Sequence, residues 1–173
     1  MIAANRPVAL LAGVLLLAAC DRADPKEGLS QPKDQLIVPK DPQSVTAATQ
    51  QARANLPIFW TAFEAAPSKE DFVVKAGMPT RGGGVEHIWI DVAGRDGDKI
   101  SGTLANEPDD LPGLKLGSRV TVKTSQVSDW AYPKNGKFYG HFTTRVMMSQ
   151  MEPDTQAKTQ AMLWPTALEE PAK

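Results

Sequence analysis

The spacing of apolar residues changes once along this chain, and that change sets the fold class. Between residues 44 and 65 the apolar side chains recur every three or four positions, which is typical of one face of a helix. They are Val45, Ala48, Ala52, Leu56, Phe59 and Phe63. From residue 72 onward apolar and polar residues alternate, which indicates strands. The two periods together predict an α+β fold.

The helical region carries its own start, break and stop signals. Ser44 is a good N-cap, so the first helix is expected to begin there. Pro57 interrupts the apolar pattern and should divide it into two helices, because proline breaks the backbone hydrogen-bond ladder of a helix. Pro57 then opens the second helix, where its missing N–H costs little, and Pro67 follows its end. The sequence therefore predicts an N-terminal helix pair.

The alternating region is divided by glycine-rich turns into five to six strands. The expected strands cover residues 72–78, 85–92, 99–105, 118–124, one that starts at Trp130 and Tyr132, and a long final strand over 137–150. Asn135 and Gly136 form a strong hairpin signal before that last strand. Because the connections are short, neighbouring strands are expected to pair antiparallel as a meander. The helix pair should pack on the apolar face of this sheet.

The first residues have the features of an export signal. Arg6 precedes an uncharged apolar run over residues 8–19, which is too short to span a bilayer but has the length of a signal-peptide core. The run ends in Leu-Ala-Ala-Cys at residues 17–20, which resembles the lipobox of bacterial lipoproteins. The resemblance implies cleavage before Cys20 and acylation (palmitate) of that cysteine. The alternative is an ordinary cleaved signal with a chance cysteine.

These features predict the organisation of the whole chain. Residues 1–19 are expected to be a lipoprotein signal peptide, residues 20–43 a lipidated cysteine with a flexible tether, residues 44–151 the folded domain and residues 152–173 a polar tail. We expect localisation in the cell envelope, anchored in a membrane through Cys20 on the periplasmic, extracytoplasmic side. Asp21 resembles an inner-membrane retention signal of some bacteria, and the choice between inner and outer membrane stays open.

Composition excludes several classes of site and partner. Cys20 is the single cysteine, so the domain holds no disulfide and no cysteine-based zinc site. The two histidines, His87 and His141, do not have metal-binding spacing, and we expect no metal or other cofactor. The formal net charge is −1, which argues against nucleic acid as a partner because such binding needs clustered Lys and Arg.

Residues 58–151 resemble the YegJ-like domain, a bacterial family of unknown function. The matching pieces include Phe59-Trp60, Glu86-His87-Ile88-Trp89, and the stretches at 102–108, 114–117, 128–130 and 140–145. Where the family pattern has Gly-Asn-Phe-Thr, this chain has Gly-His-Phe-Thr at 140–143. The resemblance implies one α+β domain and no particular activity.

Six residues are candidates for binding, each with a structural alternative. Glu86, His87 and Trp89 share one strand, but Glu86 and His87 point to opposite faces, which favours ordinary structural roles. Glu107 opens the longest loop beside Asn106 and Pro108, a geometry that turn formation alone explains.

Trp130 and Arg145 complete the candidate set. Asp129 precedes Trp130, and the hairpin could bring its carboxylate to Arg145 on the final strand. We expect this pair to be a structural clamp in preference to a binding site.

Three functions follow as hypotheses. The first is a membrane-tethered protein-binding module, immunity-like or inhibitor-like, that holds an envelope protein through exposed Trp60, Trp89 and Trp130. The second is a structural component of the envelope. The third is an enzyme on a small envelope substrate, which is disfavoured because no set of nucleophile, base and orienting group is readable. We therefore expect no catalytic residues and no enzyme activity.

Overall fold

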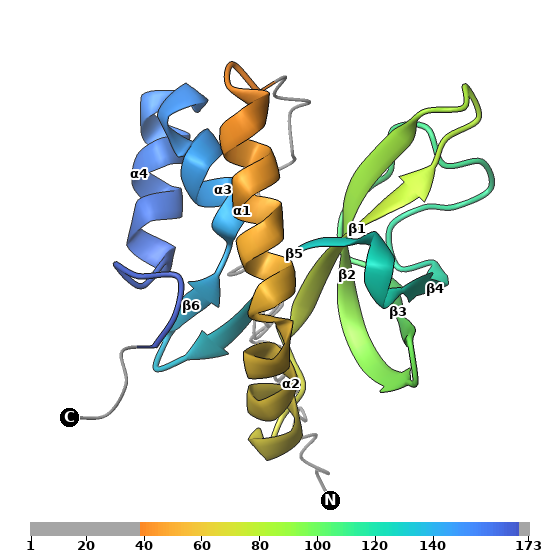
Figure 1. Ribbon diagram of the computed structural model, residues 1–173, viewed down its shortest axis with the longest axis horizontal. Coiled ribbons are helices and arrows are strands. Elements are labelled where there is room, and N and C mark those ends of the chain that lie inside the picture. Colours follow the sequence, from red (N-terminus) through yellow and green to blue (C-terminus); the bar gives the residue numbers. More distant parts are fainter. Residues whose placement is uncertain (1–38, 170–173) are drawn as a thin grey trace, which may run out of the picture. The chain divides into compact units, whose positions relative to one another are not determined.

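One antiparallel sheet and a set of helices make up the described part of the protein, residues 39–169 of a computed structural model (Figure 1). The predicted signal peptide, Cys20 and the tether up to residue 38 lie outside the described residues. The α+β class with a helix pair on an antiparallel sheet is confirmed. No helix within residues 39–169 has the length and apolar content of a membrane span.

The helix pair consists of α1 (Pro42–Ala54) and α2 (Leu56–Ala65). The expected cap at Ser44 is wrong by three residues: the Asp41 carboxylate caps α1 by accepting hydrogen bonds from the amides of Gln43 and Ser44. Asn55 separates the helices, and Pro57 lies in the first turn of α2, which confirms the predicted break.

The sheet has six strands in the order β4-β3-β2-β1-β5-β6. Their bounds are β1 Val73–Pro79, β2 Val85–Asp96, β3 Lys99–Leu104, β4 Arg119–Lys123, β5 Val127–Lys134 and β6 Lys137–Gly140. The first four strands form the expected meander, and β5 and β6 form the expected hairpin.

The expected pairing of the fourth strand with the fifth is wrong. After a 3-10 turn, η2 (Thr124–Gln126), the chain crosses back, and β5 pairs antiparallel with the free side of β1. This position places Trp130 under the helix pair, where its indole N–H donates to the carbonyl of Ala52 at 2.7 Å. Arg53 reinforces the crossing by donating to the carbonyl of Val127 at 2.6 Å. Contacts distant in sequence therefore decide the strand order.

The expected long final strand over 137–150 is also wrong. β6 ends at Gly140, and α3 (Phe142–Met147) and η3 (Met148–Gln150) follow, so Arg145 lies on a helix. Gly140 and His141 have φ of 82° and 56°, left-handed values that end the strand. Phe142 and Val146 are four residues apart, a spacing that fits both a strand face and a helix face.

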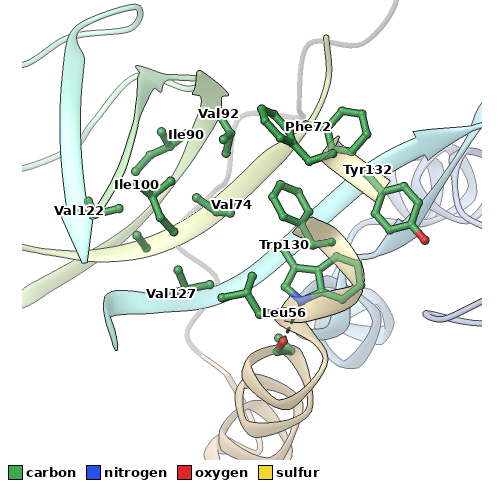
Figure 2. Close-up of a cluster of buried hydrophobic side chains, with 14 of the residues drawn as sticks. Leu56, Phe72, Val74, Ile90, Val92, Ile100, Val122, Val127, Trp130 and Tyr132 are labelled. Atoms are coloured by element: carbon green, nitrogen blue, oxygen red, sulfur yellow. Dashed lines mark hydrogen bonds between the residues drawn. The ribbon is translucent and has the colours of Figure 1, made fainter. Parts of the chain in front are cut away.

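A large apolar core fills the space between the helix pair and one face of the sheet (Figure 2). Leu56 from α2 shares this core with Val74, Ile90 and Trp130 from the strands, and all of these are buried. Trp130 is fully buried and lies 5.1 Å from Phe142, centroid to centroid, so the core extends to the first residue of α3.

A smaller cluster covers the opposite face of the sheet. Val73, Trp89, Ala131 and Phe138 pack there against Leu163, which follows α4 (Pro153–Met162). From the sequence, residues 152–173 are expected to be a polar tail with a helical turn near 156–163. In the structure α4 covers Pro153–Met162 and Leu163 is buried, so this part of the tail packs on the domain.

Gly140 gives a direct test of the β6–α3 corner. Its φ is 82°, and an added Cβ would lie 2.1 Å from the carbonyl oxygen of Trp130. We expect Gly140→Ala to lower the free energy of unfolding by about 3 kcal/mol or more in urea denaturation.

The matched control is Gly136→Ala. Gly136 has φ 74° but no atom within 4 Å of the added Cβ, so only the backbone cost of about 1 kcal/mol applies. Equal losses in the two variants would contradict the close approach at Gly140.

Candidate functional site

The buried carboxylate of Asp129 on β5 accepts four hydrogen bonds from the surrounding domain. One oxygen accepts from the amides of Trp130 at 2.8 Å and Phe142 at 2.9 Å. The other accepts from the Thr143 amide at 2.8 Å and its hydroxyl at 2.6 Å. Asp129 therefore caps the start of α3 from a neighbouring strand.

The environment of Asp129 pulls its pKa in two directions. Complete burial has the largest effect and raises the pKa above the ordinary value. The hydrogen bonds from Thr143 and Trp130 and the charge of Lys75 lower it. Since every carboxylate oxygen is already engaged by the domain itself, this geometry suits a structural anchor.

Arg145 fastens the C-terminal segment to α3. Its guanidinium donates to the carbonyl of Gly140 at 2.8 Å, that of Trp164 at 2.8 Å, and that of Thr166 at 3.2 Å. Gly140 belongs to β6, and Trp164 and Thr166 belong to the segment after α4. The side chain of Arg145 therefore joins α3 to both of these pieces of backbone.

The predicted clamp between Asp129 and Arg145 is wrong as a direct contact. Asp129 is bonded to amides of the α3 N-terminus, and Arg145 is bonded to carbonyls. The two charges influence each other at longer range, since Asp129 raises the pKa of Arg145 while desolvation, the larger effect, lowers it. The sequence identified both residues as structural and missed their partners.

His141 is buried between aromatic rings at the same corner. Its centroid is 5.0 Å from that of Trp89 and 5.7 Å from that of Phe138. The Nδ1 atom lies 3.3 Å from the hydroxyl of Thr144, and Nε2 has no hydrogen-bond partner among the described residues. Desolvation, followed by the charges of Arg145 and Lys75, lowers the pKa of His141 to about 3. The ring is therefore neutral at physiological pH.

The longest loop is held by three side chains that the sequence analysis singled out. The Glu86 carboxylate accepts from the amides of Asp109 at 2.9 Å and Asp110 at 2.8 Å. Glu107 accepts from the Leu116 amide at 3.0 Å, and the Asn106 side chain accepts from the Trp89 amide at 3.0 Å. Glu86 and Glu107 thus shape loop 105–118.

The tryptophans expected on the surface are buried, which corrects the binding argument built on them. Trp60, Trp89 and Trp130 are 5%, 1% and 0% exposed. Trp89 packs in the smaller cluster with Lys75 over its ring at 5.5 Å. His87 on the same strand is exposed, and its Nδ1 atom lies 2.9 Å from the hydroxyl oxygen of Ser128. Partial burial and the charges of Lys75 and Arg53 lower the pKa of His87.

The described residues offer little to a small ligand or a metal. No three His, Cys, Asp or Glu side chains of residues 39–169 gather in a metal-binding group. A hollow of about 410 Å³ is an open depression between α1 and the α3–η3 segment. Val45, Val146 and Gln150 are among its lining residues.

A group of cations that the sequence analysis did not single out lies at the free edge of the sheet. Arg119 and Lys123 are exposed on β4, and Lys99 is paired with Lys123 across the ladder. The alternation Arg-Val-Thr-Val-Lys at 119–123 was the available signal, because alternate residues of a strand share a face.

Comparison with known proteins places this fold in a family. Residues 42–163, well over half of the chain, match the family described as "Uncharacterized protein conserved in bacteria (DUF2314)". The chain belongs to this family. The match also confirms the resemblance to the YegJ-like domain, because the chain is 27% identical over 117 residues to the "Uncharacterized protein YegJ" of Escherichia coli K12. That alignment covers 67% of this chain and 75% of the relative.

A second relative is longer than this chain. It is a "Putative ankyrin repeat protein" of Neisseria meningitidis serogroup B, 40% identical over 76 residues. The alignment covers 44% of this chain and only 30% of that protein. No solved structure matches the chain.

The first prediction from this site concerns Arg145. Arg145→Ala should release residues 164–166 from α3 and lower the free energy of unfolding by roughly 2 kcal/mol. Hydrogen exchange should speed up at the amides of Gly140, which donates to Ala167, and of Trp164, which donates to Phe138.

Arg53→Ala is the matched control, since Arg53 also bonds a carbonyl but on β5. It should destabilise the domain and leave the exchange of Gly140 and Trp164 unchanged relative to global unfolding. Unchanged local exchange in Arg145→Ala would contradict the fastening role.

The second prediction concerns the pH dependence of stability. The folded-state pKa of His141 is about 3, whereas an unfolded histidine has a pKa of about 6.5. His141 therefore contributes stability above pH 6.5 that is lost as the pH falls toward 3, by about 1.4 kcal/mol per pH unit. Between pH 7 and pH 5, wild type should lose roughly 2 kcal/mol more than His141→Asn in urea denaturation.

Asparagine is chosen because it tolerates the left-handed backbone of position 141. His87→Asn serves as the control and should keep most of the acid-side loss, because His87 is not fully buried. Parallel pH profiles for wild type and His141→Asn would show that His141 is not the responsible group.

Proposed function

We propose that the chain is a lipid-anchored protein of the bacterial cell envelope whose domain binds another protein. The Leu-Ala-Ala-Cys motif at 17–20 supports the anchor, with Cys20 as the acylated residue and the domain on the periplasmic side. The role of such a module is the immunity-like or inhibitor-like capture of an envelope protein.

The observation that supports the binding role is a difference between two groups of polar side chains: one group bonds to the domain's own backbone, and the other faces solvent. Four polar side chains bond to the domain's own backbone and make a rigid scaffold: those of Asp129, Arg145, Glu86 and Glu107. The cations of β4 instead face solvent, where they are available to a partner. A rigid scaffold with polar chemistry on its surface suits recognition of a protein.

The longer relative gives separate support. Its name describes an ankyrin repeat protein, and such repeats build extended surfaces that bind other proteins. A domain related to this one in the same polypeptide is consistent with a binding role here.

The anchor is tested by metabolic labelling with palmitate in a Gram-negative host. The full chain should incorporate label and pellet with membranes, and Cys20→Ala should do neither. Ser30→Ala, which leaves the motif at 17–20 intact, should behave as wild type. Labelling or membrane pelleting of Cys20→Ala would overturn the anchor.

The binding role is tested with the same lipidated chain. Cross-linking in intact envelopes should yield one dominant complex, and its second component should bind the purified full chain at fixed stoichiometry in analytical ultracentrifugation. A chain that stays monomeric in envelopes, or that turns over a small substrate unaided, would count against a binding module.

A further inference from the structure

The two edges of the sheet are treated differently. Along β6 the outer edge is covered: Phe138 bridges to Leu163, the Trp164 amide donates to Phe138, and the Gly140 amide donates to the carbonyl of Ala167 at 2.7 Å. β4 forms the other edge, and among the described residues it pairs only with β3. An uncovered edge presents backbone groups to which another strand can bond.

The hydrogen bonds that flank β4 show which of its backbone groups face outward. The Ser118 carbonyl accepts from Leu104, and the Thr124 amide donates to Asp98, so these even-numbered residues face β3. Because orientation alternates along a strand, Arg119, Thr121 and Lys123 direct their backbone groups away from β3. The Lys123 amide is taken by the side chain of Gln126 at 2.8 Å, which agrees with this orientation. Arg119 and Thr121 thus offer amides and carbonyls at the edge.

The side chains of the same strand are cationic. Arg119 and Lys123 are exposed, and neither forms an ion pair within the described residues. Lys99 lies opposite Lys123 on β3 and adds a third positive charge, although the turn next to it holds Asp96 and Asp98. The edge therefore favours an incoming strand that carries negative charge.

A second copy of this chain would fit the edge poorly. Two copies of β4 paired antiparallel around a twofold axis would bring Arg119 opposite Lys123 of the other copy. Like charges placed directly opposite on paired strands are destabilising. The same repulsion disfavours edge-to-edge pairing of two copies while no partner is bound.

We infer that β4 is a docking edge, to which an extended acidic segment of a partner protein adds as a further strand beside Arg119, Thr121 and Lys123. This inference rests on the proposed binding function and names its surface. Backbone bonds to Thr121 and Arg119 supply affinity in this mode, and charge supplies selectivity.

The test uses the purified full chain and two short fluorescent peptides, one that alternates valine with glutamate and one that alternates valine with lysine. Anisotropy should show binding of the glutamate peptide, weakened by salt, and little binding of the lysine peptide. Thr121→Pro removes one outward N–H and should lower affinity roughly tenfold, whereas Thr121→Val retains that N–H and should bind as wild type.

Charge variants keep the test decisive if Thr121→Pro unfolds, which circular dichroism will show. Arg119→Glu combined with Lys123→Glu should reverse the preference toward the lysine peptide. Lys158→Glu, a single charge reversal at an exposed position of α4, should leave it unaltered. Absence of peptide binding, equal binding of both peptides, or full affinity in a folded Thr121→Pro would overturn the docking edge.

The outcomes also separate this inference from the proposed function. An envelope complex that persists in the Arg119→Glu, Lys123→Glu variant would keep the binding function and remove β4 as its surface. Peptide binding with no envelope complex would keep the edge chemistry and remove the proposed function. Oligomers formed by a neutral Arg119→Gln, Lys123→Gln variant, with no peptide binding by wild type, would show that the cations only prevent self-association.

Discussion

The fold depends on one buried carboxylate, that of Asp129. It lies on β5 and satisfies the amides of Phe142 and Thr143, which would otherwise be unpaired at the buried start of α3. Backbone donors without partners are costly inside a protein. The hydrogen bonds to Asp129 offset that cost where the chain turns from β6 into α3. The left-handed backbone of Gly140 and His141 makes the turn, and the hydrogen bonds to Asp129 fix the position of the first residues of α3. The C-terminal segment then follows, because Arg145 can hold it only from a helix placed there.

The local elements were predictable from sequence where one short-range pattern decides them. Pro57 divided the helices as expected, and the alternation in 85–92 fell on a true strand, because both signals act within a few residues. The helix α3 was missed because Phe142 and Val146 fit either period. A carboxylate thirteen positions earlier in the chain resolves that ambiguity, and it is invisible in any local window. The return of β5 to β1 escaped prediction for the same reason, since it depends on packing under α1 and α2.

The candidate residues show a related division. Glu86, Glu107, Asp129 and Arg145 were recognised as worth attention because polar side chains at turns and strand ends often have partners. What the pattern could not give was the identity of those partners, which are backbone groups of distant segments. The buried tryptophans misled for a different reason. Trp89 and His87 are two residues apart and therefore lie on the same, polar side of their strand. The smaller cluster that contains Leu163 covers Trp89 on that side.

With one face, part of the other face and one edge of the sheet covered, β4 is the edge left open for the proposed docking. The helix pair occupies one face, the segment around Leu163 occupies part of the other, and the same segment closes the β6 edge. Arg145 is thereby linked to recognition without touching a partner, because it holds the segment that closes β6 and so leaves β4 as the open edge. If that segment were released, β6 would become a second open edge, and Lys134 would lose its ion pair with Glu169. In the proposed docking mode, restriction of an incoming strand to β4 therefore depends on the contacts of Arg145 that keep β6 closed, and its charge preference depends on Arg119 and Lys123.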